Sequence, residues 1–480
     1  MNRIILIVSL LFCAVNTQCN VNTESDVQTV KKKDTKNTLG PNDFPELIHA
    51  DIPGAPKLGK PQLIMGDSLP VRGEGNGWVA PAVYDWNGDG KKDVLIGEFG
   101  SGRQWGVITG HHIRVYQNKG TDAAPEFSDE FIYAREIPEL KESTGTPLSI
   151  YTFCCFPFTP RFADLDNDGF TDLLSGQYTP GYITWFRGSA NGFLHGIKLE
   201  EAYDPIRDCW SNLDYFKASH EPPITDFKSR KYWMYSSAAF GDFDDDGDQD
   251  MIVGGEALRI CENIGTKSVP KFGKRELLYD VHGKQLESHS SVNMVPYVVD
   301  RDRDGTLDIL MTDAFTDKGK NAAVTFFRGV KTPDRPVGGK EVLRFEAGVP
   351  LFKTKNGKKE FPGSWLNICV TDWNNDGVND LLIGTSVATL KGTFDHDLSW
   401  SWEHDTGIGK LNPLYYPDSF KENIEIQQAR HDSIVAAMGK EEALKKYYVS
   451  DKEPYERYYG KGVHRTLAHK GYVYVMLGEK

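Results

Sequence analysis

Short, continuous apolar runs recur along the chain, and each follows a polar segment rich in Asp, Asn and Gly. The runs read VLIG, LLSG, MIVG, ILMT and LLIG, at residues 94–97, 173–176, 251–254, 309–312 and 381–384. Another apolar residue stands two positions before each polar segment: Val83, Phe162, Phe240, Val298 and Val370. Apolar runs of this length, bounded by turn residues, are typical of strands buried on both faces. We therefore predict five hairpins, each within a sheet that packs between two neighbouring sheets.

A third apolar stretch follows each hairpin, at residues 112–118, 182–188, 257–263, 323–329 and 472–478. The segments APEF and VPKF indicate fourth strands near Phe127 and Phe272. Four strands per unit, with each unit burying its faces against the next, predict an all-β fold: a β-propeller of four-stranded blades.

The two ends of the chain are predicted to close the ring. The last third strand, 472–478, has no fourth strand after it, whereas residues 54–66 are similar in composition to the fourth-strand segments. The N-terminal segment would then complete the last blade and remove two exposed sheet edges. Five polar segments and this closure favour five blades. Seven blades are the alternative, with residues 189–236 and 386–470 as the only room for two more.

The second of these stretches, at about 386–470, is predicted to be a short helical insertion in the last blade. Ser419 and Glu422 have the spacing of a capping box, and Gly439 is suited to end the helix. The propeller with its insertion is thus assigned to residues 44–480.

The polar segments share one pattern, D-x-[DN]-x-D-G-x-x-D, and are named loops 1 to 5. They span residues 85–93, 164–172, 242–250, 300–308 and 372–380, and successive loops begin 79, 78, 58 and 72 residues apart. A recurrence at periods of this size indicates an array of supersecondary units.

Oxygen-bearing side chains at this spacing are suited to Ca²⁺, which takes roughly six to eight oxygen ligands. Side chains at loop positions 1, 3 and 5 converge when the chain turns tightly, Gly at position 6 permits that turn, and position 7 offers its backbone carbonyl. An EF-hand would add Glu at position 12, but position 12 holds Ile96, Ser175, Val253, Met311 and Ile383. Position 9 must therefore supply the closing carboxylate.

The candidate metal ligands follow from these positions. They are Asp85, Asn87, Asp89, Lys91 and Asp93 in loop 1; Asp164, Asp166, Asp168, Phe170 and Asp172 in loop 2; Asp242, Asp244, Asp246, Asp248 and Asp250 in loop 3; Asp300, Asp302, Asp304, Thr306 and Asp308 in loop 4; and Asp372, Asn374, Asp376, Val378 and Asp380 in loop 5. Up to five Ca²⁺ ions are expected, mainly as structural staples. Position 4, which holds Asp245 in loop 3 and Arg303 in loop 4, is expected to be a bystander.

The five loops between paired apolar strands resemble the FG-GAP or VCBS-type repeat, known from the calcium-binding propeller of integrin α chains and from many secreted bacterial proteins. The resemblance covers roughly residues 80–385, and Phe240-Gly241 is the one match to the FG of the name, with no GAP at the expected place. The resemblance implies that the side chains at positions 1, 3, 5 and 9 of each loop are calcium ligands.

Composition agrees with a soluble globular protein. The chain has 480 residues, of which 39% are hydrophobic and 26% charged, and its formal net charge is −13. A basic stripe that would bind nucleic acid is not found, so nucleic acid is not an expected partner. Five Ca²⁺ ions would bring the charge of −13 to −3 and relieve the repulsion between carboxylates within each loop.

The N-terminus has the features of an export signal. Arg3 precedes an apolar stretch over residues 4–15, which is too short to span a bilayer. Residues 1–19 are therefore predicted to be a signal peptide and residues 20–43 a flexible tether. The protein is expected to be secreted, periplasmic or displayed at the cell surface, with no transmembrane segment in the mature chain. Lipid anchoring at Cys19 stays open as an alternative.

The remaining cysteines do not form a disulfide-dense framework. Cys261 and Cys369 fall in apolar strand patterns and are expected to be buried thiols. The adjacent Cys154 and Cys155 could form a vicinal disulfide, pair elsewhere or help to hold zinc, and the sequence leaves these alternatives open.

Three functions fit this sequence. The main prediction is a binding or adhesion module for an extracellular glycan or protein ligand; whether the protein is also an enzyme is left open, with a non-enzymatic role favoured. The alternative is a polysaccharide lyase or related glycan-active enzyme, and the third is a scaffold within a surface assembly. No residue is assigned a catalytic role, although acid–base candidates exist: His111, His112, Tyr151, Arg161, Arg207, His220, His289, His404, His464 and His469. For His112, at the start of a strand, a hydrogen-bonded structural histidine is the expected state.

Overall fold

The computed structural model of the protein describes most of the strands predicted above. It describes residues 46–73, 78–98, 111–137, 147–150, 156–177, 181–202, 236–255, 257–286, 294–312, 324–332, 342–354, 364–390, 436 and 467–479. The predicted signal peptide and tether, Cys19, Cys154 and Cys155 lie outside these residues. So does the predicted helix over 419–439, apart from Ala436, which is helical.

Five antiparallel sheets make up the body of the protein, and each corresponds to one predicted blade. Blade 1 contains β5 (Val79–Tyr84), β6 (Asp93–Glu98), β7 (Ile113–Tyr116) and β8 (Ile132–Tyr133). Blade 2 contains β9 (Arg161–Ala163), β10 (Asp172–Ser175), β11 (Thr184–Phe186) and β12 (Ile197–Lys198). Blade 3 contains β13 (Ser237–Gly241), β14 (Asp250–Gly254), β15 (Arg259–Cys261) and β16 (Glu276–Leu277).

Blades 4 and 5 are less regular than the first three. Blade 4 contains β17 (Val295–Val299), β18 (Asp308–Thr312), β19 (Val324–Phe327) and β22 (Val349–Pro350). Blade 5 contains β24 (Ser364–Thr371), β25 (Asp380–Leu390), β26 (Leu467–Met476) and β3 (Gln62–Leu63), and β26 also pairs with β4 (Arg72–Gly73). Three two-stranded ladders complete the list: β1 (Leu47–His49) with β23 (Phe352–Thr354), β2 (Lys57–Leu58) with β27 (Gly478–Glu479), and β20 (Gly329–Thr332) with β21 (Val342–Phe345).

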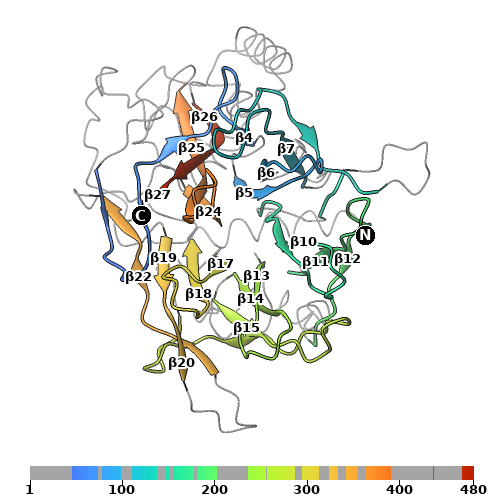
Figure 1. Ribbon diagram of the computed structural model, residues 1–480, viewed down its shortest axis with the longest axis vertical. Coiled ribbons are helices and arrows are strands. Elements are labelled where there is room, and N and C mark those ends of the chain that lie inside the picture. The colour runs from blue at the N-terminus through green and yellow to red at the C-terminus, as the bar shows by residue number, and fades with distance from the viewer. Residues whose placement is uncertain are drawn as a thin grey trace.

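Five hydrophobic clusters lie between the five pairs of adjacent blades. Leu95 of blade 1 packs with Leu173 of blade 2, and Leu174 of blade 2 packs with Met251 of blade 3. Two further clusters join blade 3 to blade 4 and blade 4 to blade 5. The fifth cluster joins blade 5 to blade 1, where Leu382 packs with Val94. Because the last blade packs on the first, the sheets form a closed ring, as Figure 1 shows. The predicted all-β, five-bladed propeller is confirmed.

Glycine at the end of the second strand lets neighbouring blades approach closely. A Cβ atom added at Gly97, Gly176 or Gly254 would lie 1.9, 1.8 or 1.9 Å from a backbone carbonyl oxygen of the next blade's inner segment. A Cβ at Gly384 of blade 5 would lie 2.5 Å from the carbonyl oxygen of Val79 in blade 1. The glycines that end four of the five apolar runs therefore permit contact between blades.

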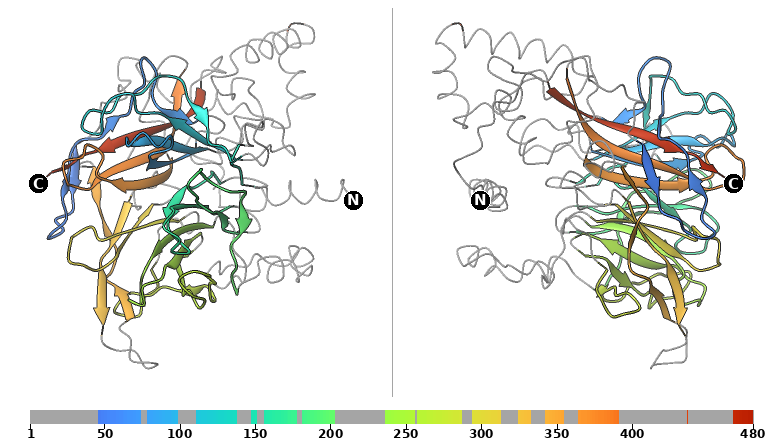
Figure 2. Two further views of the ribbon diagram at one scale, coloured as in Figure 1. Left: turned by 45° about the vertical axis from the view of Figure 1, so that its right-hand side comes forward. Right: turned by 90° about the vertical axis from the view of Figure 1, so that its left-hand side faces the viewer.

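The N-terminal segment closes the ring, as predicted. Strand β3 is the fourth strand of blade 5, with Leu63 opposite Tyr474 of β26. Before it, β1 pairs with β23 beside blade 4, and β2 pairs with the last strand of the chain, β27. In Figures 1 and 2 the blue N-terminal segment accordingly lies beside the red C-terminal strands. The segment fastens two neighbouring blades and covers the edge of β26.

The fourth strands lie near Phe127 and Phe272, as predicted, but begin a few residues later in the chain. They are β8 at Ile132–Tyr133 and β16 at Glu276–Leu277, whereas Phe127 and Phe272 are buried side chains outside any strand. The reason is a polar turn: the side-chain oxygen of Asn118 accepts hydrogen bonds from the backbone of Gly120 and Glu126, and Asn263 does the same with Gly265 and Lys271. These bonds bend the chain away from the sheet before the fourth strand begins.

The insertion in blade 5 follows a longer hairpin than predicted. Strands β25 and β26 remain paired out to Leu390 and Leu467, so the sheet extends into the stretch assigned to the insertion.

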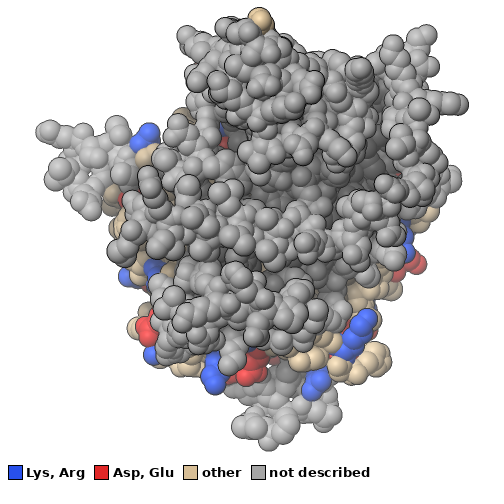
Figure 3. Space-filling view, turned by 180° about the vertical axis from the view of Figure 1, so that it is seen from behind, with Lys and Arg blue, Asp and Glu red and all other residues tan. Residues whose placement is uncertain are grey.

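No helix among the described residues is long and apolar enough to span a membrane. Seen from behind, in Figure 3, Lys and Arg are interspersed with Asp and Glu where described residues reach the lower rim.

Candidate metal centres

The five loops lie at one end of the ring. Each connects the first strand of its blade to the second, and this connection has the same direction in every blade. Hydrogen bonds between neighbouring loops support this placement. Lys92 Nζ donates to the carbonyl oxygen of Asp372, and Arg303 Nη2 donates to the carbonyl oxygen of Gly377 over 3.0 Å. Loops 1, 5 and 4 are therefore linked in the order of their blades.

The aspartate at position 1 shapes each loop through its own backbone. In all five loops its Oδ1 accepts a hydrogen bond from the backbone N–H of position 5, and its Oδ2 accepts one from the glycine at position 6, over 2.8–3.1 Å. The position 5 carboxylate likewise accepts the N–H of position 7, over 2.8–3.1 Å. The loop is thus held by side chain–backbone bonds typical of Asx turns.

Two positions in each loop have left-handed backbone. Gly at position 6 has φ between 82° and 88° in every loop. Position 4 is also left-handed: Gly88 has φ 72°, and Asn167, Asp245, Arg303 and Asn375 have φ 54–61°. Position 4 therefore has a conformational role beside its expected place as a bystander in metal binding, because a left-handed backbone restricts the residue types that fit. Its preference for Gly, Asn and Asp was the signal in the sequence.

The aspartate at position 9 fastens the loop to the rest of the blade. These residues are Asp93, Asp172, Asp250, Asp308 and Asp380, and each is no more than 2% exposed. One carboxylate oxygen accepts the N–H of position 2 over 2.6–3.1 Å, and the other accepts an N–H at the end of the third strand over 2.6–2.8 Å. Position 9 therefore links three parts of its blade, apart from any role as a metal ligand.

Burial changes the acidity of these carboxyl groups. It raises the pKa of all five position 9 residues, to about 7 for Asp250 and about 6 for Asp308. In loop 3, burial and the neighbouring Asp246 also raise the pKa of Asp248, at position 7, to about 6. The sequence assigned only the carbonyl of Asp248 to the site, but the charges of Asp246, Asp244 and Asp242 also act on its carboxyl group.

Three loops bring carboxylates close enough to share one ion. Ligand oxygens lie within 4.8 Å of one another in Asp164, Asp166 and Asp172 of loop 2, in Asp242, Asp244 and Asp246 of loop 3, and in Asp300, Asp302 and Asp304 of loop 4. In loops 1 and 5 position 3 is an asparagine, which donates a 3.2 Å hydrogen bond to the aspartate at position 5. The loops thus share a backbone geometry and differ in charge.

The donors present fit a hard cation. Position 3 is buried in loops 2 and 4, where Asp166 and Asp302 are 3% and 5% exposed. One oxygen of each, Oδ1, is buried without a hydrogen-bond donor among the described residues. A buried carboxylate oxygen without a donor is costly, and a Ca²⁺ ion would satisfy it.

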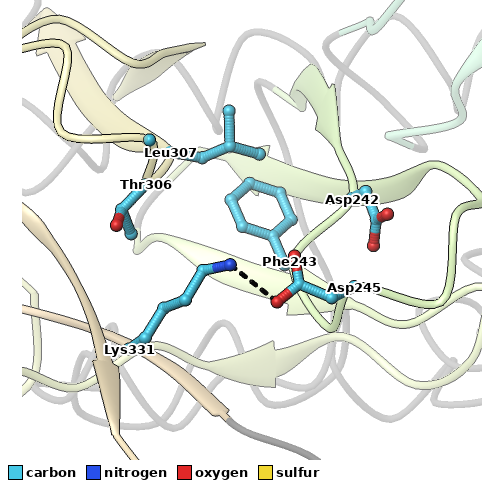
Figure 4. A pocket seen from close by; sticks show the side chains of 7 residues that line it. Asp242, Phe243, Asp245, Thr306, Leu307 and Lys331 are labelled. Carbon is cyan, nitrogen blue, oxygen red and sulfur yellow. Dashed lines mark hydrogen bonds and ion pairs between the residues drawn. The ribbon is translucent and has the colours of Figure 1, made fainter.

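Cationic side chains also reach the loops. Arg187 Nη2 pairs with Asp166 Oδ2 and lies 3.3 Å from Asp168 Oδ2, while Arg328 Nη2 lies 2.7 Å from Asp302 Oδ2. Between loops 3 and 4, Asp242, Asp245, Thr306 and Lys331 help to line a small pocket (Figure 4). There Lys331 Nζ pairs with Asp245 Oδ2 over 2.7 Å, at the outward-facing position 4.

The acid–base candidates from the sequence are not gathered into one site among the described residues. His111 is fully buried, and its backbone pairs with Ile150. His112 Nδ1 lies 3.2 Å from the carbonyl oxygen of Leu148, as expected of a structural histidine. Arg161 donates to the carbonyl oxygens of Pro160 and Pro296 in the interior. His469 lies in β26, and the remaining candidates lie outside the described residues. The free thiols of Cys261 and Cys369 are buried, as expected.

Comparison with known proteins gives few matches. No family model matches the chain, and no curated protein does. Among solved structures, a GH43_1 enzyme from Xanthomonas citri is 11% identical with a TM-score of 0.34, over 68% of this chain and 85% of that one. The complex of the GH43_1 enzyme with xylose is 12% identical with a TM-score of 0.33, over 68% of this chain and 84% of that one. A fructofuranosidase from Schwanniomyces occidentalis complexed with fructose is 10% identical with a TM-score of 0.28, over 68% of this chain and 54% of that one. At these values the likeness carries no argument about activity, and the fold rests on the sheet topology above.

The backbone at position 4 can be tested at Asn167, which is exposed. Asn167→Gly is expected to leave the free energy of unfolding nearly unchanged, because glycine accepts the φ of 54°. Asn167→Val is expected to lower it by about 1–2 kcal/mol, the cost of a left-handed conformation with a branched Cβ. Urea denaturation would measure both, and equal stability of the two variants would contradict the assignment.

A pH dependence follows from the raised pKa of Asp250. The folded protein holds this proton up to about pH 7, whereas the unfolded chain releases it near 3.8. Stability is therefore present at low pH and is lost as pH rises through the folded value, by about 1.4 kcal/mol per unit of pKa difference. In chelator, the free energy of unfolding is expected to fall between pH 5 and 7.5. Asp250→Asn should flatten this slope, and an unchanged slope in that variant would exclude Asp250 as its source.

Proposed function

We propose that the protein is an exported, calcium-stabilised β-propeller that displays a binding surface for a glycan or protein ligand, related to the FG-GAP and VCBS-type repeats. The observation that carries the metal part is the fivefold repetition of one loop geometry, with acidic groups converging in loops 2, 3 and 4. Loops 2, 3 and 4 differ from ordinary Asp-Gly turns, since a turn needs no buried carboxylate at position 3 and these loops have one.

The ions in this proposal stabilise the fold and take no part in a reaction. Positions 1, 3 and 5 would hold the ion. Position 9 would close the site where its carboxylate lies close to the others, as that of Asp172 does in loop 2. Bound Ca²⁺ would neutralise the carboxylates and fix the loop between the first two strands. Ring closure by β3 and stabilised loops at one end would make the propeller a rigid support for ligand contacts.

Calcium removal is expected to lower the melting temperature. An ion that binds only the folded state adds about 2.7 kcal/mol per site at a hundredfold excess over its dissociation constant. Melting curves of the full-length protein in EDTA, Mg²⁺ and Ca²⁺ would measure this, and Asp244→Ala should reduce the calcium effect by removing a loop 3 ligand. Identical curves with and without Ca²⁺, on protein shown to be metal-free, would refute the metal part of the proposal.

The binding role is distinguished from the lyase alternative by turnover. Incubation with uronic-acid polysaccharides is expected to give no rise in the ultraviolet absorbance of unsaturated products, because a binding module holds its ligand without cleaving it. Glycan retention on an affinity gel would measure binding without turnover. Formation of unsaturated product would replace the binding module by an enzyme.

A further inference from the structure

Loop 4 departs from the other loops at position 2. In loops 2, 3 and 5 this position holds a buried apolar residue, Leu165, Phe243 or Trp373, and in loop 1 it holds Trp86. In loop 4 it holds Arg301, whose exposed fraction is only 1%. A charged side chain thus occupies a place that the repeat otherwise fills with an apolar one. Departures from a local pattern are expected at functional or strained places.

The guanidinium group of Arg301 is only partly satisfied. Its Nη2 donates to the carbonyl oxygen of Pro56 over 3.1 Å, whereas Nε and Nη1 are buried without an acceptor among the described residues. The described residues also place no carboxylate within ion-pair distance of it. Asp308 acts on its charge, but the two Asp308 oxygens accept the backbone N–H groups of Arg301 and Gly329. A buried charge without a close partner is costly.

A small cavity lies beside this side chain, between loop 4 and the N-terminal segment. Its volume is about 30 Å³, and it is lined by Arg301, by Leu351 after β22 and by residues of the N-terminal segment between 49 and 58. In Figure 1 the blue N-terminal segment accordingly lies beside β22. One water needs on the order of 10–15 Å³, and a site for an organic ligand several hundred. The cavity therefore suits a water molecule or a small ion.

The charges around the cavity favour an anion. Lys57 lines it together with Arg301, and among the described residues of the lining Asp51 is the acidic one. Asp51 is exposed, so water and salt screen its charge. His49 also lines the cavity; burial lowers the pKa of its imidazole, opposed by the charge of Glu479, so at neutral pH the ring offers a hydrogen-bond donor without a charge.

We propose that this cavity is a binding site for one small inorganic anion, with chloride as its ligand, held by the guanidinium group of Arg301. The inference is independent of the proposed calcium binding. A water molecule would supply the missing hydrogen-bond acceptor, whereas chloride supplies the acceptor and the missing negative charge. Because Arg301 also bonds to Pro56, a bound chloride would fasten the segment that closes the ring to blade 4.

The test is thermal unfolding of the full-length protein in sodium chloride and in sodium methanesulfonate, at equal ionic strength and equal Ca²⁺ concentration. Methanesulfonate is a polyatomic anion too large for the cavity. An anion that binds only the folded state multiplies the ratio of folded to unfolded molecules by about elevenfold at ten times its dissociation constant. The melting temperature of the wild-type protein is therefore expected to be higher in chloride.

Arg301→Leu is the informative variant, because leucine stands at the equivalent position 165 in loop 2. It keeps the backbone N–H that bonds to Asp308 and is expected to lose the chloride response. Without chloride its melting temperature is expected to equal or exceed that of wild type, since an apolar side chain replaces a buried charge. Arg344→Leu, on β21, is the matched control: it removes the same group outside the cavity and is expected to keep the full response.

A second measurement needs no variant. Crystals grown with bromide in place of chloride are expected to show an anomalous scattering peak in the cavity beside Arg301, and this peak decides the matter should Arg301→Leu fail to fold. Equal melting temperatures in the two salts, with no bromide in the cavity, would show that water alone fills it and would overturn the proposal. A chloride response of the same size in Arg301→Leu and in wild type would also overturn it, since the effect would then arise elsewhere on the protein.

Discussion

Each blade depends on one buried carboxylate, the aspartate at loop position 9. Its two oxygens accept backbone hydrogen bonds from position 2 and from the end of the third strand, for example from Leu165 and Gly188 to Asp172. An unpaired buried carboxylate is costly, and two buried N–H groups without an acceptor would be costly as well. The three groups satisfy one another, and this mutual requirement fixes how the loop sits on the sheet.

The same residue sets the register of the core. Position 10 follows the anchor directly and is the first buried apolar residue of the second strand, such as Leu173, Met251 or Ile309. In a strand with alternating faces, a slip of one residue would exchange the two faces. The anchor prevents that slip, so successive apolar residues reach the clusters on opposite sides of the blade: Leu173 packs toward blade 1, and Leu174 toward blade 3. Ring closure thus begins from a polar interaction at one end of each sheet.

Local patterns predict much of this fold because they act within a short stretch of chain. The apolar runs, the Asp-Gly loops and the similarity of residues 54–66 to other fourth strands were sufficient for five blades and for the closure by β3. The exact start of the fourth strands was not predictable, because Asn118 and Asn263 redirect the chain through hydrogen bonds that leave no apolar pattern. The left-handed backbone at position 4 was not predicted, because the sequence was searched for ligand positions and apolar runs rather than for backbone conformation. Arg187 and Arg328 were missed because they reach the loops only through strand pairing.

The loops also explain why a bound ion would act on stability more than on loop shape. The carboxylates at positions 1 and 5 already accept the backbone N–H groups of the loop, so its conformation is set without metal. Each carboxylate oxygen keeps a further lone pair, and these lone pairs concentrate negative charge at one point. Repulsion therefore accumulates in a backbone that is otherwise well satisfied. A cation at that point lowers the electrostatic energy of the folded state, and in loops 2 and 4 the guanidinium groups of Arg187 and Arg328 already supply part of that charge.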